Sequence, residues 1–491
     1  MDPSPDPTVQ PEAVPELPLL LGGEEVPGEG PVITVFDRYG LEPRALARAA
    51  SPAQCETALA RAEAAFRAGA LSPFERGRIL ARAARLLEER AESFIATMQG
   101  EAGFTRADAK GELERAVQTL LLSGEEARRL SGEMLPLEGA PGQTGRLGFT
   151  IRVPLGVVLA ITPFNAPLNT VAHKIAPAIA AGNAVVLKPS SSTPETALRL
   201  GRLLLEAGLP PGLLSVLYGP GESALALVED PRVRFVAFTG STEAGLAIQR
   251  RAGLKRTQME LGSIAFTILC ADADLDRAVP KIVNAAYRKA GQVCTSIQIL
   301  LVHETIAAAV EARLAERVRA LPFGDPRQPA TVVGPLISEA EARRVERSIA
   351  EAVAGGARLL AGGGRRGAVV EPTLLADLRP EMRVMREEIF GPVLALVPFA
   401  RLEEAIARVN ATPYGLATGI FTDSLEQALA AARSLEVGAV HVNETSSSRV
   451  DLMPYGGCKA SGFGREGPRF AIREMSEERV VTIAVANGRR G

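Results

Sequence analysis

The sequence predicts an α/β protein with two lobes in series, each a doubly wound parallel sheet, and a small β arm for oligomerisation. A chain of 491 residues has room for more than one domain at about 150 residues each. Short apolar runs recur about every 20 to 30 residues between helical stretches, which is typical of βαβ units. The composition, 46% hydrophobic and 23% charged, is that of an ordinary globular protein.

The first 30 residues are predicted to be a disordered leader, because they combine many prolines with acidic residues and contain no Lys or Arg. They lack the basic start of a signal peptide. No apolar run reaches the roughly 18 residues of a membrane span. The formal net charge is −2, which argues against wholesale attraction to nucleic acid or an anionic membrane. We therefore expect a cytoplasmic protein without nucleic-acid or membrane partners.

The first lobe begins with long helices, since residues 53–131 are rich in Ala, Leu, Glu and Arg with apolar residues at helical spacing. The Pro/Gly-rich stretch 135–148 ends this pattern, and 149–153 alternates like a strand. A series of apolar runs then predicts parallel strands covered on both faces. These strands are 157–161, 185–187, 214–217 and 235–238.

The second lobe repeats the rhythm, with strands at 266–269 and 298–302 and helices over 274–288 and 305–321. The terminal run 479–485 is β-rich and follows a Gly-rich region, so we expect it to leave the body and pair with another subunit. The predicted units are a leader, 1–30; a first lobe, 31–130 and 154–264; a second lobe, 265–450; a return to the first lobe, 451–475; and the β arm, 131–153 and 476–491.

Four cysteines occur, none at zinc-finger or CxxC spacing, so neither a disulfide framework nor a metal site is expected. Cys294 stands in the small, polar context Gly291–Ser296. A nucleophilic cysteine needs such an accessible position, with backbone donors or a helix terminus to stabilise the thiolate. The hexapeptide alone also fits a buried structural cysteine.

Three further segments place chemistry at strand ends. Glu260 ends an apolar strand just before Gly262 and is a candidate general base, although a solvated surface glutamate fits as well. Gly240 and Ser241 follow a strand and open a helix whose N–H groups could receive a phosphate. Lys188 offers a cation at the same sheet edge, where ligands of open α/β sheets bind.

Together these motifs resemble the aldehyde dehydrogenase superfamily over about residues 53–483. Within it, the chain looks most similar to lactaldehyde, succinic semialdehyde, phosphonoacetaldehyde and non-phosphorylating glyceraldehyde-3-phosphate dehydrogenases. The motifs are Thr162–Asn165, Lys188–Ser190, Phe238–Thr242, Glu260–Gly262, Gly291–Cys294, Glu387–Pro392, Pro413–Leu416 and Pro454–Gly457, in that order.

The resemblance implies two Rossmann-like lobes, of which the first, 31–130 and 154–264, is the domain that binds NAD or NADP and the second, 265–450, is the catalytic domain. It also implies a homodimer or homotetramer assembled through the arm. It implies that Cys294 attacks the aldehyde, that Asn165 and the Cys294 N–H hold the oxyanion, and that Glu260 activates water to hydrolyse the thioester. The cofactor contacts that it implies or suggests are Ile161, Thr162, Lys188, Ser191, Gly240, Ser241, Leu261, Glu388 and Phe390.

Departures from the common family pattern bear on specificity. Ser191 stands where strict NAD enzymes often have glutamate, so a 2′-phosphate is not repelled and NADP use is permitted. Ala166 replaces a bulky aromatic, which should recess one wall of the substrate tunnel. Val293 stands where enzymes acting on glyceraldehyde 3-phosphate often have arginine, and this weakens the case for a phosphorylated substrate without excluding one. Arg449, in the loop at the substrate entrance, could bind an anionic tail, or instead form a salt bridge to Asp451 or another loop residue.

The sequence thus predicts oxidation of a small polar aldehyde, with an anionic one as an option, to its carboxylic acid. Two alternatives stay open. In a CoA-acylating enzyme, CoA instead of water would capture the thioester, and Glu260 argues against this branch. A catalytically silent structural or binding protein could use the same scaffold, although Cys294, Glu260 and Asn165 together argue against it.

Overall fold

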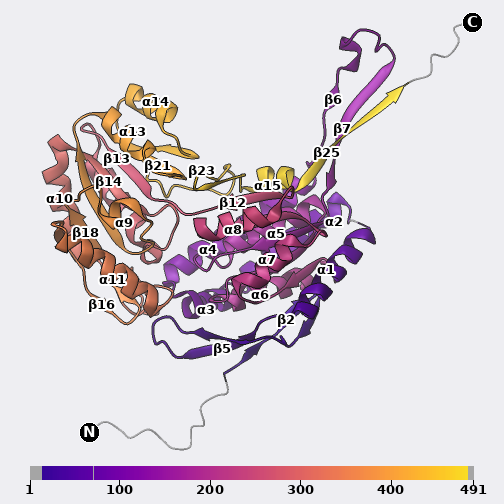
Figure 1. The fold of residues 1–491 in the computed structure, drawn as a ribbon, viewed down its shortest axis with the longest axis horizontal. Helices are drawn as coiled ribbons and strands as arrows, with labels where there is room; N and C mark the ends of the chain where they lie inside the picture. The colour runs from indigo at the N-terminus through magenta and orange to yellow at the C-terminus, as the bar shows by residue number, and fades with distance from the viewer. Residues whose placement is uncertain (1–13, 70, 485–491) are drawn as a thin grey trace, which may run out of the picture.

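The computed structural model describes residues 14–69 and 71–484 and has two α/β lobes and a projecting arm (Figure 1). Each lobe has its own hydrophobic core. One core gathers buried residues between Leu17 and Leu261 together with Ile472 and Met475. The others gather residues between Ile264 and Leu435. The predicted fold class is confirmed.

The first lobe is built on an eight-stranded sheet whose five central strands are parallel. Edge strands β24, β2 and β3 run antiparallel to their neighbours. The order across the sheet is β24 (Gly462–Phe463), β12 (Arg256–Glu260), β11 (Val233–Thr239), β8 (Val157–Ile161), β9 (Ala184–Lys188), β10 (Leu214–Val216), β2 (Leu19–Leu21) and β3 (Glu24–Val26).

Helices cover this sheet, as the apolar periodicity of 53–131 predicts. Local chemistry sets the start of several. Ser51 and Ser72 each cap a helix that has proline at its first position and Gln or Glu three residues after the cap. The helices are α1 (Pro52–Arg67), α2 (Pro73–Glu89), α3 (Ala91–Ala102), α4 (Arg106–Ala127), α5 (Asn169–Ala181), α6 (Pro194–Glu206), α7 (Gly221–Glu229), α8 (Thr242–Ala252) and α15 (Pro468–Glu474).

The predicted disordered leader over residues 1–30 is wrong for its second half, while residues 1–13 lie outside the described part. Residues 16–26 form three short strands. Leu19, Leu20 and Leu21 are buried, and β2 extends the main sheet beside β10. A small sheet also forms, in the order β1 (Glu16–Leu17), β5 (Pro43–Arg48) and β4 (Val32–Phe36). Pairing with a distant strand buries these leucines. The free energy of this burial therefore outweighs the tendency of the polar, proline-rich composition to stay disordered.

The second lobe holds a seven-stranded sheet whose strands are parallel except for the edge strand β15. The order is β15 (Arg358–Ala361), β18 (Thr373–Ala376), β19 (Val393–Phe399), β14 (Ile297–His303), β13 (Ala265–Leu269), β21 (Ala417–Phe421) and β22 (Ala439–Val442). Its helices are α9 (Leu275–Tyr287), α10 (Glu304–Arg319), α11 (Glu339–Ala354), α12 (Arg383–Arg386), α13 (Leu402–Asn410) and α14 (Leu425–Ser434).

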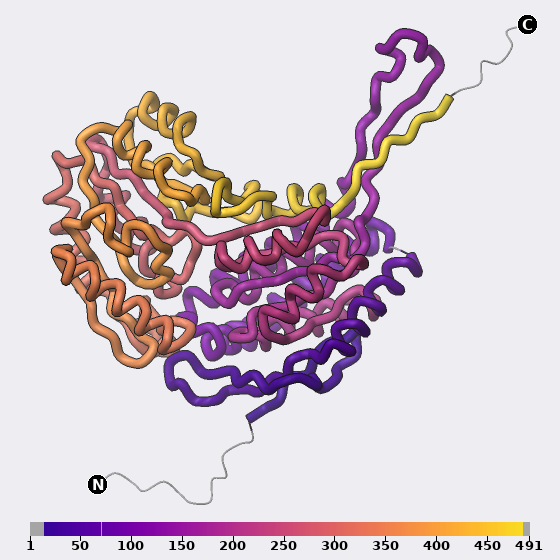
Figure 2. Tube along the Cα trace, viewed as in Figure 1, coloured from indigo at the N-terminus to yellow at the C-terminus, as the bar shows by residue number. Residues whose placement is uncertain are grey.

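The chain crosses between the lobes twice, and Figure 2 shows the yellow C-terminal segment running back along the first lobe to the arm. The arm is a three-stranded antiparallel sheet, in the order β25 (Ser476–Ala484), β7 (Arg146–Pro154) and β6 (Met134–Leu135). The remaining elements are the hairpin of β16 (Arg365–Arg366) and β17 (Val369–Val370), the antiparallel pair of β20 (Tyr414–Gly415) and the distant β23 (Cys458–Lys459), and the 3₁₀ turns η1 (Leu137–Gly139) and η2 (Arg288–Gly291).

Across the described ranges, no helix has the length and apolar character needed to cross a membrane.

Candidate active site

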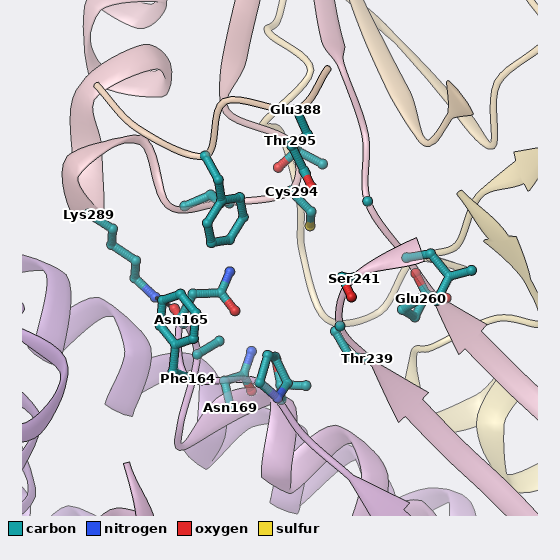
Figure 3. A pocket seen from close by; sticks show the side chains of 18 of the residues that line it. Phe164, Asn165, Asn169, Thr239, Ser241, Glu260, Lys289, Cys294, Thr295 and Glu388 are labelled. Atoms are coloured by element: carbon teal, nitrogen blue, oxygen red, sulfur yellow. Dashed lines mark hydrogen bonds between the residues drawn. The ribbon is translucent and has the colours of Figure 1, made fainter. Parts of the chain in front are cut away.

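A cavity of about 550 Å³ lies where the two lobes meet. Figure 3 shows Cys294 and Glu388 on the side of the second lobe, Asn165 and Asn169 on another side, and Glu260 near Ser241. Ten predicted site residues line this cavity, whereas Ile161, Thr162, Lys188 and Ser191 lie outside its lining. The ten are Asn165, Ala166, Gly240, Ser241, Glu260, Leu261, Cys294, Glu388, Phe390 and Arg449.

Cys294 reaches the cavity because the chain turns sharply after α9. Lys289 and Ala290 have left-handed backbone angles, with φ of 51° and 52°. Gly291 follows at φ 70°, and a Cβ there would lie 2.1 Å from the Gly391 carbonyl oxygen. Only glycine fits this close approach. The turn ends the helix and places Cys294 just before β14.

Among the described residues, the Cys294 thiol has one hydrogen-bond partner, the Tyr455 hydroxyl, which lies 2.9 Å from Sγ. Burial raises the pKa of Cys294 to about 11, and the Tyr455 hydrogen bond and the Arg449 charge act in the opposite direction. The resting side chain is therefore a thiol at neutral pH. Its reactivity depends on neighbours that stabilise the thiolate.

The Asn165 side chain points at the same turn. Its Nδ2 donates to the Gln292 carbonyl oxygen at 2.9 Å, and its own backbone carbonyl accepts from the Lys289 ammonium at 3.1 Å. An amide nitrogen carries two protons. One is fixed by Gln292, and the second is free for another acceptor next to Cys294.

Glu260 ends β12 and is buried, with 4% of its surface exposed. Neither carboxylate oxygen has a hydrogen-bond partner among the described residues. Burial, followed by the nearby Glu466 charge, raises the pKa of Glu260 well above its usual range. Such a carboxylate holds no neighbour in place and can accept a proton from water.

Glu466 forms a buried ion-pair cluster beside Glu260, and the sequence reasoning missed it. Its carboxylate accepts from Lys174 Nζ at 2.8 Å and from Arg449 Nη2 at 2.7 Å. Burial alone would raise the pKa of Glu466, but these two cations outweigh it and hold the pKa well below its usual range. Glu466 is thus a permanent anion.

Arg449 lines the cavity as predicted, and its partner is Glu466 rather than Asp451. Its guanidinium carbon lies 3.7 Å from the centre of the Tyr455 ring. Asp451 instead accepts from Arg115 at 2.6 Å and approaches His173 Nε2 at 2.8 Å. Direct binding of an anion by Arg449 stays a prediction.

Arg288, the first residue of η2, was also missed, because it stands at the end of the predicted helix 274–288 and does not belong to a recognisable motif. It lines the cavity, and its Nη2 donates to the Ser447 hydroxyl at 3.2 Å. No carboxylate of the described residues lies within ion-pair distance of it. Burial lowers the pKa of Arg288, yet an arginine keeps its charge in any protein environment. Within the described part of the chain, the cavity therefore holds an arginine without a direct ion-pair partner, and Asp108 and Glu112 act on its charge only from farther away.

Next to the cavity, the strand ends suit a dinucleotide. Ser241 caps α8, accepting from the Ala244 N–H, and leaves the first helical N–H groups open to a phosphate. The Thr162 hydroxyl is buried and has no hydrogen-bond partner in the part of the chain that the structure describes. Burial lowers the pKa of Lys188, at the end of β9, to about 8. These groups, with the buried carboxyl of Glu388, fit the pyrophosphate and hydroxyl-rich riboses of NAD(P).

The fold and these side chains fit a class of protein, the nicotinamide-dependent oxidoreductases. The model of the aldehyde dehydrogenase family matches residues 26–481. The chain is 45% identical to 3-sulfolactaldehyde dehydrogenase of Priestia megaterium, over 91% of this chain and 94% of that one.

Two solved structures are similar throughout. Aldehyde dehydrogenase 21 of Physcomitrella patens, in complex with the reaction product succinate, has a TM-score of 0.93 at 37% identity, covering 96% of this chain and 98% of that one. The glyceraldehyde-3-phosphate dehydrogenase of Methanocaldococcus jannaschii, complexed with NADP, has a TM-score of 0.89 at 36% identity, covering 92% and 99%. The chain belongs to the aldehyde dehydrogenase family. It is an NAD(P)-dependent enzyme, as the sequence predicts.

Proposed function

We propose that this enzyme oxidises a small aldehyde with an anionic tail to its carboxylic acid, and that Arg288 binds the tail. The observation that carries the proposal is that Arg288, in the cavity that also contains Cys294, has no carboxylate of the described residues within ion-pair distance. An anion would form this direct ion pair in a site screened from water, where charge-assisted hydrogen bonds are strongest.

The chemistry needs three residues of the chain. The Cys294 sulfur adds to the aldehyde carbon, and the Asn165 amide and the Cys294 N–H stabilise the oxyanion. Bound NAD(P)⁺ supplies the hydride acceptor, and Cys294 is left as a thioester. Glu260 then takes a proton from water, whose oxygen attacks the thioester carbon and releases the acid and the thiol. The unpartnered carboxylate oxygens of Glu260 support this role.

Arg449 is less free to bind the tail than Arg288, because Glu466 already accepts from it at 2.7 Å. The Ser447 hydroxyl accepts from Arg288 and donates its one proton to the Thr295 carbonyl at 3.0 Å, so it holds the guanidinium in place. The Thr295 hydroxyl, 3.1 Å from that of Ser447, would add a neutral donor for a tetrahedral or planar anion. The names of the similar proteins, with sulfolactaldehyde, succinate and a phosphorylated aldehyde, support a carboxylate, phosphate or sulfonate tail.

The test compares an anionic aldehyde with a neutral one of equal length in an Arg288→Met variant. A hydrogen bond to a charged group is worth roughly 1.5–3 kcal/mol, so kcat/KM for the anionic aldehyde should fall about 10- to 100-fold, mainly through KM. The neutral aldehyde should be little affected. Arg347→Met, at an exposed position of α11, is the matched control. Equal losses for both aldehydes would contradict the proposal.

Adding CoA to the same assay tests the acylating alternative. Since Glu260 is in place to activate water, the free acid should form at an unchanged rate and no acyl-CoA should appear. Acyl-CoA as the main product would contradict the proposal and would assign the enzyme to the CoA-acylating branch.

We also propose a homodimer or homotetramer assembled through the arm. The outer edge of β25 is unpaired within the described chain. Apolar side chains of the arm are exposed, which favours a protein partner. They are Met134, Leu147, Ile151, Val480 and Ile483. The four cysteines are free thiols, and this supports the expected cytoplasmic location, where thiols stay reduced.

A further inference from the structure

We propose that the Tyr455 hydroxyl is a catalytic hydrogen-bond donor that stabilises the Cys294 thiolate, and that Arg449 behind the tyrosine ring is its positioning residue. The inference rests on the proposed role of Cys294 as nucleophile. It gives Arg449 a function that does not require contact with substrate.

The first support is the geometry of Tyr455. Its Oη lies 2.9 Å from the Cys294 Sγ, the atom that would carry the negative charge. Only 8% of the tyrosine is exposed. Two backbone hydrogen bonds pair it with Glu466, from Tyr455 N–H at 3.1 Å and back from Glu466 N–H at 2.7 Å. The hydroxyl is therefore held at the sulfur before any substrate binds.

The second support is the direction of the hydrogen bond. Burial, followed by the neighbouring Cys294, holds the pKa of Tyr455 well above its usual range. The phenol therefore keeps its proton when the thiol loses its own. A thiolate can only accept, so the hydroxyl must be the donor in the ionised state.

Arg449 strengthens this donor. Its guanidinium carbon lies 3.7 Å from the ring centre, which places a full positive charge against the aromatic face. Glu466 fixes the guanidinium from the other side at 2.7 Å. A cation over the ring draws electron density from the phenol and attracts the thiolate as well.

The other charged groups around Cys294 act in both directions. Glu260 on β12 and Glu388, in the segment after α12, disfavour a second negative charge. Arg288 on η2 favours it. Burial and two carboxylates oppose ionisation of the thiol, and Tyr455 and Arg449, together with Arg288, offset them. Deleting the hydroxyl should thus leave the thiol harder to ionise.

The test is the pH dependence of Cys294 alkylation by iodoacetamide, without substrate or cofactor. The thiolate sulfur forms a bond to carbon, iodide leaves, and the thiol proton passes to solvent. Labelling of the Cys294 peptide is followed by mass spectrometry, because Cys55 and Cys458 are also partly exposed. Because this assay contains no aldehyde, its result tests the role of Tyr455 separately from the proposed substrate.

In Tyr455→Phe, loss of a hydrogen bond to a charged acceptor should raise the pKa of the Cys294 thiol by about one to two units. A higher pKa also makes the thiolate a better nucleophile, which offsets part of the loss. At pH 8 the labelling rate should therefore fall about 3- to 10-fold. Tyr39→Phe, at an exposed tyrosine, should label like the parent.

Arg449→Lys keeps the charge next to Glu466 and loses the planar stack, so it should shift the profile in the same direction by less. If Tyr455→Phe does not fold, Arg449→Lys provides the test in the same labelling assay. An unchanged profile in a folded Tyr455→Phe protein would overturn the inference. So would a Tyr455→Phe profile moved to lower pH.

Discussion

We expect that replacing the buried carboxylate of Glu260 makes the protein more stable and, at the same time, less active. Glu260→Gln keeps the size of the side chain and removes its charge. In the folded protein both oxygens lie without donors, and Glu466 stands close by. In the unfolded chain water solvates the carboxylate, so ionisation favours unfolding. The variant should be more stable than the parent at neutral pH.

The sign follows from the pKa of Glu260, which folding raises. The native state binds a proton that the unfolded state has lost between the ordinary glutamate value, about 4.3, and the raised value. Stability of the parent therefore falls as pH rises through this window. The variant has no such dependence, so its advantage should be absent near pH 4 and grow towards pH 8.

The magnitude comes from the charge, since a glutamine amide at the same place also lacks partners. A buried polar group without a partner costs about 1–3 kcal/mol, and a charged one costs more, so removal of the charge should gain on the order of 1–3 kcal/mol. For a cooperative unit of 150–250 residues, each kcal/mol shifts the melting temperature by roughly 2–4 °C. Scanning fluorimetry at pH 5 and pH 8 should show a gain of several degrees at pH 8 and a smaller one at pH 5. Glu316→Gln, at an exposed position of α10, is the control.

A Glu260→Gln protein less stable than the parent at pH 8 would refute this reasoning. It would mean that the carboxylate has a partner in solution that holds it in place.

Three further changes test other parts of the site and assembly. Ser191→Glu puts a carboxylate beside the expected adenosine ribose, so the NADP-to-NAD ratio of kcat/KM should fall on the order of tenfold or more; an unchanged ratio would place the ribose elsewhere. Truncation after Met475 deletes β25, which pairs with β7 over its whole length, and should lower the mass by light scattering or abolish soluble expression; a truncated protein with parental mass and activity would exclude the arm from assembly. Ala166→Phe fills part of the cavity and should exclude larger aldehydes whatever their charge, as a substrate series with neutral and anionic members would reveal; equal activity on large and small aldehydes would mean that Ala166 is not in the tunnel wall.

Local sequence patterns predict most of the fold because buried parallel strands are short, continuous apolar runs. The run 157–161 corresponds to β8 and the run 235–238 lies within β11. Local patterns do not predict the strands at residues 16–26, because a strand of two or three residues is too short to show a periodic pattern. Leu20 is held by pairing with Val216, almost two hundred positions away.

The same division applies to the site. Cys294, Glu260 and Asn165 stand in recognisable local motifs, so the sequence could single them out. The contacts that tune them come from distant segments. Lys174 and Glu466 are separated by 292 positions. The partner of Arg449 could not be chosen from sequence, since Asp451 is nearer in the chain and Glu466 is nearer in space.

The most direct test of the two-step chemistry is to mix Glu260→Gln with excess aldehyde and cofactor and follow one turnover. Because Cys294 should react before water is needed, we expect about one equivalent of reduced cofactor per active site, slow release of acid, and an acyl adduct on the Cys294 peptide by mass spectrometry. Cys294→Ala should give neither reduced cofactor nor adduct. A Cys294→Ala variant that turns over near the parental rate would contradict the account.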